Sequence, residues 1–240
     1  MSRSKLLGAA LALPLMIAGA GSAQANIIGI VIDGSGSISG ADFTTQKNGY
    51  ISALTSLLNI DGSNSIGVWQ FSATVSPVFA VQKIDSAAKK TALLTAIGAM
   101  VQIGSSTAIG DAITTAATAM NLFNTALNCG SIGGCGNRII DVSTDGDNNT
   151  GSDPTVAANA AFATGIKVNC LGVGIALCNF NNAPGVGSDF PAATFAQFEA
   201  VLRTKLSAEL TPTPEPLTMS LFGAGLVGAA ALRRRKSKTA

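Results

Sequence analysis

The middle of the chain alternates between short apolar runs and longer segments in which apolar residues recur at helical spacing. The run at 27–32 is continuously apolar, which is typical of a strand buried on both faces. The same reasoning predicts further strands at 66–71, 138–143 and 166–173, a proline-containing edge strand at 75–81, and helices at 41–58, 86–100, 109–127, 154–163 and 193–210. This alternation predicts an α/β domain, doubly wound, with a mostly parallel central sheet and helices on both faces.

The amino-terminal segment has the pattern of a secretory signal peptide. Arg3 and Lys5 form a basic start, an apolar run covers 6–20, and small residues at Ala23 and Ala25 occupy the positions that a signal peptidase reads. We therefore expect residues 1–25 to be removed on export. The folded domain is expected at 26–210.

The carboxyl-terminal segment, 211–240, follows a different pattern. A Thr/Pro linker leads into Pro214-Glu215-Pro216, an apolar run at 217–232 and a basic cluster at 233–236. The apolar run predicts a short transmembrane helix at about 217–232, whose basic end would stay in the cytoplasm.

This order of features resembles the PEP-CTERM sorting signal of Gram-negative bacteria. The resemblance implies that an exosortase, a membrane transpeptidase, processes the tail near Pro-Glu-Pro; a simple tail anchor is the alternative. Both interpretations export the domain to the cell envelope, cell surface or extracellular matrix, with at least transient anchoring in the inner membrane.

Removing the two end segments changes the charge of the chain. The whole sequence has 15 basic and 13 acidic residues, but seven of the basic residues lie in the ends, so the middle carries a net charge of −5. This composition offers no basic patch for nucleic acid. The four cysteines of an exported chain favour disulfides, and of the three possible pairings Cys129–Cys135 and Cys170–Cys178 close the shortest loops.

Polar residues follow the predicted strands where ligands bind in open α/β sheets. Asp33, Ser35 and Ser37 follow the first strand, Thr107 precedes a helix, and Asp145 follows the strand at 138–143. Two carboxylates and three hydroxyls suit a hard divalent cation that keeps waters and an open position.

These segments resemble the motifs of von Willebrand factor type A (vWA) domains. Residues 33–37, Asp-Gly-Ser-Gly-Ser, resemble the Asp-x-Ser-x-Ser motif, and Thr144-Asp145-Gly146 resembles Thr-Asp-Gly. Residues 107–113 resemble the Thr-x-Thr-Gly segment, although Ile109 replaces a hydroxyl residue, and 67–72 are similar to the family's second strand. The match covers about 26–210.

The resemblance implies a metal-ion-dependent adhesion site with Asp33, Ser35, Ser37, Thr107 and Asp145 as ligands. The implied cation is Mg²⁺, with Mn²⁺ or Ca²⁺ as alternatives. The implied function is binding, without enzymatic activity, of an acidic group on a protein or polysaccharide. More narrowly, 138–149 and 167–169 resemble a group of exported bacterial vWA-like proteins with no assigned activity. Residues 178–192 are short for the family's helix and sixth strand, which leaves that sheet edge open.

Other functions fit the residues less well. A dinucleotide-binding fingerprint would need glycine where the chain has Ser39, and the absence of histidine removes the usual base of a hydrolase. An EF-hand beginning at Asp145 would need glycine at Thr150 and glutamate at Val156. A passive envelope or matrix component with a stabilising metal stays an alternative.

Two further carboxylates are expected outside the ligand set. Asp141, inside an apolar strand, is expected to pair with Arg138 or a backbone donor, and Asp111 to face solvent.

Overall fold

The computed structural model describes residues 25–129, 134–175, 178–211 and 225. The chain divides into two units, one spanning Ala23–Glu215 and one made of Met1–Ser22 and Pro216–Ala240. Only the first is described in detail. The predicted signal peptide and tail helix lie almost entirely outside the described residues. Within the described part, none of the helices combines the length and the apolar character needed to cross a membrane.

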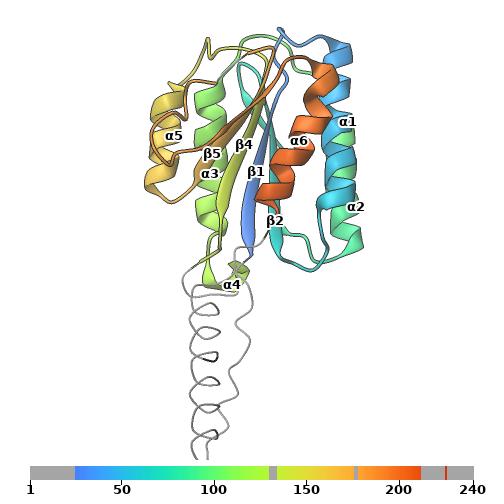
Figure 1. Ribbon diagram of the computed structural model, residues 1–240, viewed down its shortest axis with the longest axis vertical. Helices are drawn as coiled ribbons and strands as arrows, with labels where there is room; N and C mark the ends of the chain where they lie inside the picture. The colour runs from blue at the N-terminus through green and yellow to red at the C-terminus, as the bar shows by residue number, and fades with distance from the viewer. Residues whose placement is uncertain (1–24, 130–133, 176–177, 212–224, 226–240) are drawn as a thin grey trace, which may run out of the picture. The chain divides into compact units, whose positions relative to one another are not determined.

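The described residues form one six-stranded sheet in the order β3-β2-β1-β4-β5-β6 (Figure 1). Neighbouring strands are parallel except for the antiparallel pair β2 and β3. This arrangement confirms the predicted α/β architecture. The strands are β1 (Asn26–Asp33), β2 (Asn64–Phe71), β3 (Val75–Lys83), β4 (Arg138–Thr144), β5 (Lys167–Val173) and β6 (Asp189–Ala192).

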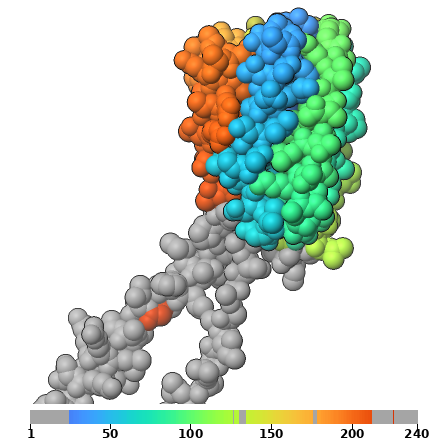
Figure 2. Space-filling model, turned by 90° about the vertical axis from the view of Figure 1, so that its right-hand side faces the viewer, coloured from blue at the N-terminus to red at the C-terminus, as the bar shows by residue number. Residues whose placement is uncertain are grey.

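Helices cover both faces of the sheet, and each face has its own apolar core. On one face α1, α2 and α6 pack against the sheet around an apolar core that includes Ile28 of β1 and Tyr50 of α1. Figure 2 shows the outer surface of this helical layer. On the other face α3 and α5 pack over Ile27 and Val31. The helices are α1 (Gly40–Leu57), α2 (Ala87–Gly98), α3 (Ile109–Phe123), α4 (Ala126–Cys129), α5 (Pro154–Ala163) and α6 (Phe195–Glu209).

The edges of the sheet follow from local sequence. Pro77 lies in β3, which pairs only with β2 within the described residues, as predicted for an edge strand. At the other edge the structure contains the sixth strand that the sequence left open. Turns connect β5 to β6, and the backbone N–H groups of Val168 and Cys170 donate to Val186 O and Ser188 O.

The helix predicted at 109–127 ends earlier than expected. α3 stops at Phe123, because Asn124 has non-helical backbone angles (φ −71°, ψ 69°). The Asn124 side chain accepts a hydrogen bond from Cys135 N at 2.7 Å, which connects the end of α3 to the segment directly before β4. Both predicted disulfides, Cys129–Cys135 and Cys170–Cys178, are present.

A group of charged side chains is buried between β4 and α6. Lys205 forms an ion pair with Asp141, and its Nζ lies 3.4 Å from Glu209 Oε1. All three side chains are at most 3 % exposed. Tyr50 and Asn169 complete the group by donating hydrogen bonds to Asp141 (3.4 Å) and Glu209 (2.7 Å). The expectation that Asp141 pairs with Arg138 or a backbone donor is wrong in its partner, because α6 brings Lys205 to the sheet, while the expected structural role agrees with this ion pair.

Arg138 has other partners. Its guanidinium donates to Asn121 Oδ1 at 2.7 Å and to the carbonyl of Thr164, which ties the start of β4 to the ends of α3 and α5.

Burial controls the protonation of the two carboxyls beside Lys205. Burial raises the pKa of Glu209 to about 7, Lys205 acts against this increase, and the charge of Asp141 adds to it. Burial also raises the pKa of Asp141, although Lys205 favours its ionised form. Burial together with the charge of Asp141 thus outweighs the effect of Lys205, which explains why Glu209 keeps a proton to higher pH than an exposed glutamate.

This cluster gives a testable pH dependence of stability. The folded-state pKa of Glu209 lies above its ordinary value of 4.5, so the folded protein binds this proton more tightly than the unfolded chain. The contribution of Glu209 to stability is therefore full below about pH 4.5 and is lost as pH rises through 7. Glu209→Gln should remove this loss, up to about 3 kcal/mol between pH 4.5 and 8, in urea unfolding.

Glu199→Gln is the control, because Glu199 pairs with Arg203 on the surface of α6. This variant should keep the wild-type decline in stability. An equal decline in Glu209→Gln and wild type would contradict the assignment.

Candidate metal centre

Asp33 ends β1 at the carboxyl edge of the sheet, where it is fully buried. Its Oδ1 accepts a hydrogen bond from Ser35 N at 2.8 Å, and its Oδ2 accepts one from Thr144 Oγ1 at 2.6 Å. Thr144 is the last residue of β4, the strand beside β1. The carboxylate therefore fixes the turn after β1 and joins it to the neighbouring strand.

A chain of hydroxyls connects this turn to Asp145. Ser35 Oγ lies 3.0 Å from Ser37 Oγ, and Ser37 Oγ donates to Asp145 Oδ1 at 2.7 Å. Ser35 is buried, Asp145 is half-buried and Ser37 is exposed, so the oxygens run from the interior to the surface. The structure thus brings together four of the five predicted ligand residues in a connected group.

Thr107 reaches the group through the loop that carries Asp145. Its backbone N–H donates to Asn149 Oδ1 at 2.8 Å, and its carbonyl accepts from Asn149 N at 3.0 Å. Its side chain is buried, directly before α3. The described contacts hold Thr107 against the β4–α5 loop, while its hydroxyl makes no described hydrogen bond to the other four residues.

Glycines and amides shape the turn after β1. A Cβ atom at Gly34 would overlap the Gln70 amide, so a larger residue between Asp33 and Ser35 would displace that side chain. Gly36 N donates to Ser105 O at 2.8 Å, and Ser105 adopts a left-handed backbone with φ of 74°. These contacts bring the loop before Thr107 against the turn.

Two glutamines hold the same turn by its carbonyls. Gln46 Nε2 donates to Asp33 O at 2.8 Å, and Gln102 Nε2 donates to Ser35 O at 2.9 Å. Neither glutamine was predicted from the sequence, because a glutamine in a helix or loop carries no motif of its own.

The electrostatics of the group favour a cation. Burial raises the pKa of the Asp33 carboxyl, hydrogen bonds from Thr144 and Ser35 act in the opposite direction, and the charge of Asp145 raises it again. Within the described residues, no lysine or arginine forms an ion pair with Asp33 or Asp145. Two carboxylates and neutral hydroxyls without a cationic partner fit a hard divalent cation. Once bound, such an ion would supply a Lewis-acidic position for an oxygen of a ligand.

The β4–α5 loop also supplies the cap of α3. The N-cap residue, Ala108, has no side-chain acceptor, and Asn148 Oδ1 accepts from Ile109 N at 2.7 Å in its place. Asp153 caps α5 by accepting from Thr155 N and Val156 N. The structure also argues against an EF-hand. Asp153 caps α5 and Asn149 Oδ1 accepts from Thr107 N, so neither side chain is arranged as an EF-hand ligand.

Asp111 was expected to face solvent, but its carboxylate also has a hydrogen-bonding partner in the loop before α5. It accepts from Ser152 N at 2.9 Å and from Ser152 Oγ at 2.5 Å, and these bonds lower the pKa of its carboxyl. This bond joins α3 to the loop before α5.

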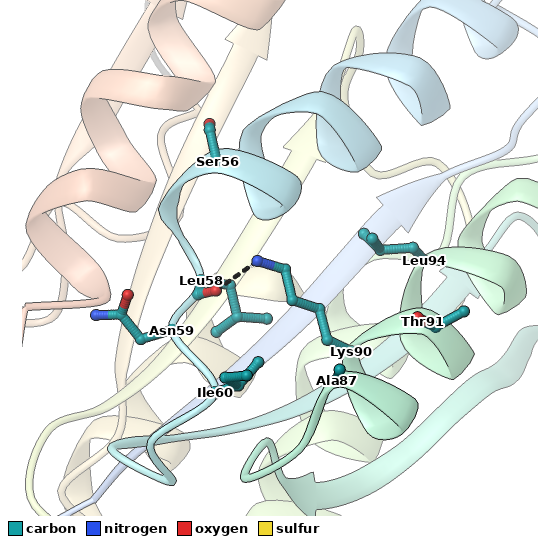
Figure 3. Close-up of a pocket in the computed structure, with 8 residues that line it drawn as sticks. All are labelled: Ser56, Leu58, Asn59, Ile60, Ala87, Lys90, Thr91 and Leu94. Atoms are coloured by element: carbon teal, nitrogen blue, oxygen red, sulfur yellow. Dashed lines mark hydrogen bonds between the residues drawn. The ribbon is translucent and has the colours of Figure 1, made fainter.

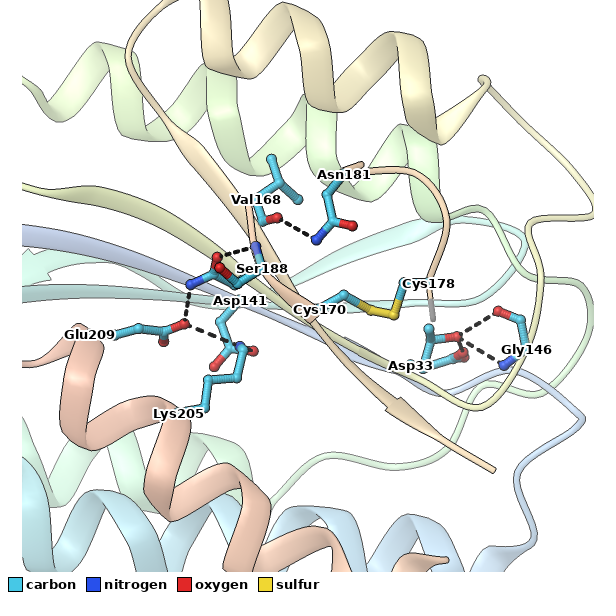
Figure 4. The surroundings of a disulfide bond; sticks show 12 residues. Asp33, Asp141, Gly146, Val168, Cys170, Cys178, Asn181, Ser188, Lys205 and Glu209 are labelled. Atoms are coloured by element: carbon cyan, nitrogen blue, oxygen red, sulfur yellow. Dashed lines mark hydrogen bonds and ion pairs between the residues drawn. A yellow bond between two sulfur atoms is a disulfide. The ribbon is translucent and has the colours of Figure 1, made fainter. Parts of the chain in front are cut away.

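One other group has metal-like spacing. Cys170, Cys178 and Asp189 lie together, but the two sulfurs form a disulfide and are not thiolate ligands. Figure 4 shows this disulfide between the buried Lys205 cluster and the carboxyl edge of the sheet, where Asp33 at the end of β1 and Gly146 in the loop after β4 lie. Its role is structural: it ties the segment after β5 to the interior of that strand.

Two cavities flank the described domain at different places. One of about 460 Å³ adjoins the Asp145 loop and is lined by Asp147, Asn148 and Asn179, among others. The other, about 400 Å³, lies between the end of α1 and the start of α2. In Figure 3, Lys90 crosses that second cavity and its Nζ donates to Leu58 O at 2.6 Å, so this ammonium is already satisfied.

The arrangement of sheet and helices is that of a von Willebrand factor type A domain. A structure described as von Willebrand factor type A from Catenulispora acidiphila matches 78 % of this chain and 43 % of its own, with 16 % identity and a TM-score of 0.62. Proximal thread matrix protein 1 from the mussel byssus matches 78 % of this chain with 24 % identity and a TM-score of 0.61. One structure of that mussel protein has a zinc-occupied MIDAS motif (23 % identity, TM-score 0.58).

The pilus adhesin SpaC from Lactobacillus rhamnosus GG matches with 16 % identity and a TM-score of 0.61 over 79 % of this chain. This chain covers 47 % of the mussel protein and 30 % of the adhesin. At these identities the similarity shows the fold.

The chain belongs to the family described as protein of unknown function (DUF1194), whose model matches residues 26–214. A PEP-CTERM protein-sorting motif matches residues 212–236, as the resemblance of the tail implied. No curated protein sequence matches the chain.

The cap supplied by Asn148 can be tested directly. Asn148→Ala removes the acceptor of Ile109 N and should lower the free energy of unfolding by about 1 kcal/mol in urea titration. Asn59→Ala, at an exposed position, should leave it nearly unchanged. Equal stability of the two variants would show that α3 does not depend on this cap.

Proposed function

We propose that this domain is an exported, metal-ion-dependent binding module. Asp33, Ser35, Ser37, Thr107 and Asp145 hold one divalent cation, with Mg²⁺ preferred and Mn²⁺ or Ca²⁺ able to use the same donors. An open position of the ion accepts a carboxylate from an acidic protein or polysaccharide. The observation that carries the proposal is the buried Asp33 carboxylate, which is joined to Asp145 through Ser35 and Ser37 and which, within the described residues, forms no ion pair with a lysine or arginine.

The donor set explains why such an ion would bind a further anion. Two carboxylates balance the ion's charge, but the hydroxyl ligands are neutral, so the ion keeps electrophilic character toward an incoming oxygen. The net charge of −5 in the middle of the chain gives little long-range attraction to an acidic partner. Affinity would therefore come from the metal and from local contacts.

The PEP-CTERM motif supports a location outside the cytoplasmic membrane, with an exosortase acting on the tail. The two ends of the described domain meet at the sheet edge opposite Asp33, where Asn26 Nδ2 donates to Thr211 O at 3.3 Å. A chain held by its tail would therefore present the opposite edge of the sheet, which carries Asp33 and Asp145 and is named the metal edge, away from its attachment. Transient anchoring through residues 217–232 belongs to the same proposal.

The similar structures agree with an extracellular role. One is a matrix protein of the mussel byssus and another is a pilus adhesin. Their names lend support to adhesion over catalysis, and the absence of histidine from the sequence makes a hydrolase the weaker candidate. A passive matrix component, in which the metal only stabilises the loops, is the second candidate, because the same residues already join three loops by hydrogen bonds.

Metal affinity tests the proposed ligands. Asp33→Asn and Asp145→Asn should each weaken Mg²⁺ binding by more than about tenfold in calorimetry, because each removes a charged donor. Thr144→Val should weaken it by about 10- to 100-fold, because it removes the hydrogen bond that orients Asp33. Asp147→Asn is the matched control, exposed on the same loop. Wild-type affinity in both Asp33→Asn and Asp145→Asn would refute the site.

Partner capture separates adhesion from passive stabilisation. Wild-type protein should retain acidic protein or polysaccharide from an envelope extract with Mg²⁺, lose it with EDTA, and recover it when Mg²⁺ is restored. Asp33→Asn should retain none under any condition. Identical captured material with and without EDTA would reject adhesion, and a melting temperature that still rises with Mg²⁺ would then favour the passive role.

A further inference from the structure

The sheet edge opposite the metal centre exposes large apolar side chains. This surface, which we name the basal edge, contains the amino ends of β1, β4 and β5 and the turn α4, seen at the lower end of the described domain in Figure 1. Leu127 on α4 is 91 % exposed and Leu122 in the last turn of α3 is 77 % exposed. Side chains with this exposure bury little apolar area within the fold, so both leucines stay available for an apolar contact outside it.

The turn that carries Leu127 is held in place. The Cys129–Cys135 disulfide links its last residue to the segment before β4, and Asn128 Nδ2 donates to Phe123 O at 2.9 Å. Asn124 Oδ1 also accepts from Cys135 N at 2.7 Å. The exposed leucine therefore projects from a cross-linked turn.

Charged residues are sorted between the two ends of the domain. At the basal edge five basic side chains face two acidic ones: Lys83, Lys89, Lys90, Arg138 and Lys167 against Asp61 and Asp85. At the metal edge one basic side chain, Lys47, accompanies Asp42, Asp111, Asp145, Asp147 and Asp153. This separation orients the domain with its basal edge toward an anionic surface.

The chain itself indicates which surface that is. Thr211 lies at the basal edge, hydrogen-bonded to Asn26. Only five residues, 212–216, separate it from the apolar run at 217–232, which is followed by three arginines and a lysine. Five extended residues span at most about 18 Å. A tail that enters a bilayer at this run keeps the basal edge close to the lipid headgroups.

We propose that the basal edge docks on anionic phospholipid headgroups, with Leu122 and Leu127 entering the interface and Lys167 facing the lipid phosphates. This inference rests on the exported, tail-anchored state proposed above, and it is independent of metal binding. Docking would hold the domain upright on the bilayer and direct the metal edge outward. Apolar insertion combined with basic side chains is the usual basis of such interfacial contacts.

Tryptophan fluorescence in reconstituted vesicles tests the docking. The full chain carries Leu127→Trp or, as the matched control, Val101→Trp, which is 79 % exposed and whose carbonyl accepts from Gln70 near the metal edge. The native Trp69 is buried and common to both proteins. Brominated lipids should quench the tryptophan at position 127 in vesicles that contain phosphatidylglycerol, and should leave the one at position 101 unquenched.

Charge and metal arms complete the experiment. Quenching at position 127 should decrease in phosphatidylcholine alone, at high salt, and after Lys167→Glu, an exposed position where a change of charge is tolerated by the fold. Three outcomes would overturn the proposal: equal quenching at positions 101 and 127, no quenching at 127, or no response to lipid charge and salt. The second outcome is also the one expected if a second copy of the chain covers Leu127. Mg²⁺ affinity in the same samples reports separately on the metal site.

Discussion

The hydrogen bonds of the Asp33 carboxylate join the parts of this molecule that lie far apart in sequence. One oxygen holds the turn after β1 and the other holds the end of β4, so a single buried group fixes the two central strands at their carboxyl ends. The turn then positions Ser35 and Ser37, and Ser37 reaches Asp145 on the next loop. Within the described residues these partners are neutral donors and none is a cation, so the proposed divalent ion would supply the charge that a buried carboxylate otherwise lacks.

The domain contains a second place where carboxylates are buried, and the contrast is informative. Below the metal edge, Asp141 and Glu209 have Lys205 as an internal cation. Asp33 and Asp145 have no such side chain among the described residues. The same fold therefore supplies its own positive charge in one place, and in the other the proposed function assigns that charge to an external ion. Gln46 joins β4 to the end of β1 above that cluster, since it accepts from Ser143 Oγ and donates to Asp33 O.

Much of this arrangement was predictable because it depends on local patterns. The strands are short apolar runs, and their ends differ from the prediction by no more than about two residues, as at Asn64–Phe71. The disulfides followed from the short loops that they close. The helix predicted at 109–127 was too long because the asparagine at position 124 looks like any polar helix residue until its side chain is seen to bind Cys135. The sixth strand is four residues long, too short to give a pattern of its own.

By itself the sequence determined the α/β class, the order of most elements, the two cysteine pairs and the set of oxygen-bearing residues after the strands, because each depends on neighbours within a few positions along the chain. Only the tertiary structure placed Lys205 against Asp141, Thr144 against Asp33, and Asn148 on the amino end of α3. The partners in these three contacts are 64, 111 and 39 residues apart in the sequence. Such contacts depend on how helices pack across the sheet and how loops meet at its edge, and no local periodicity records that geometry.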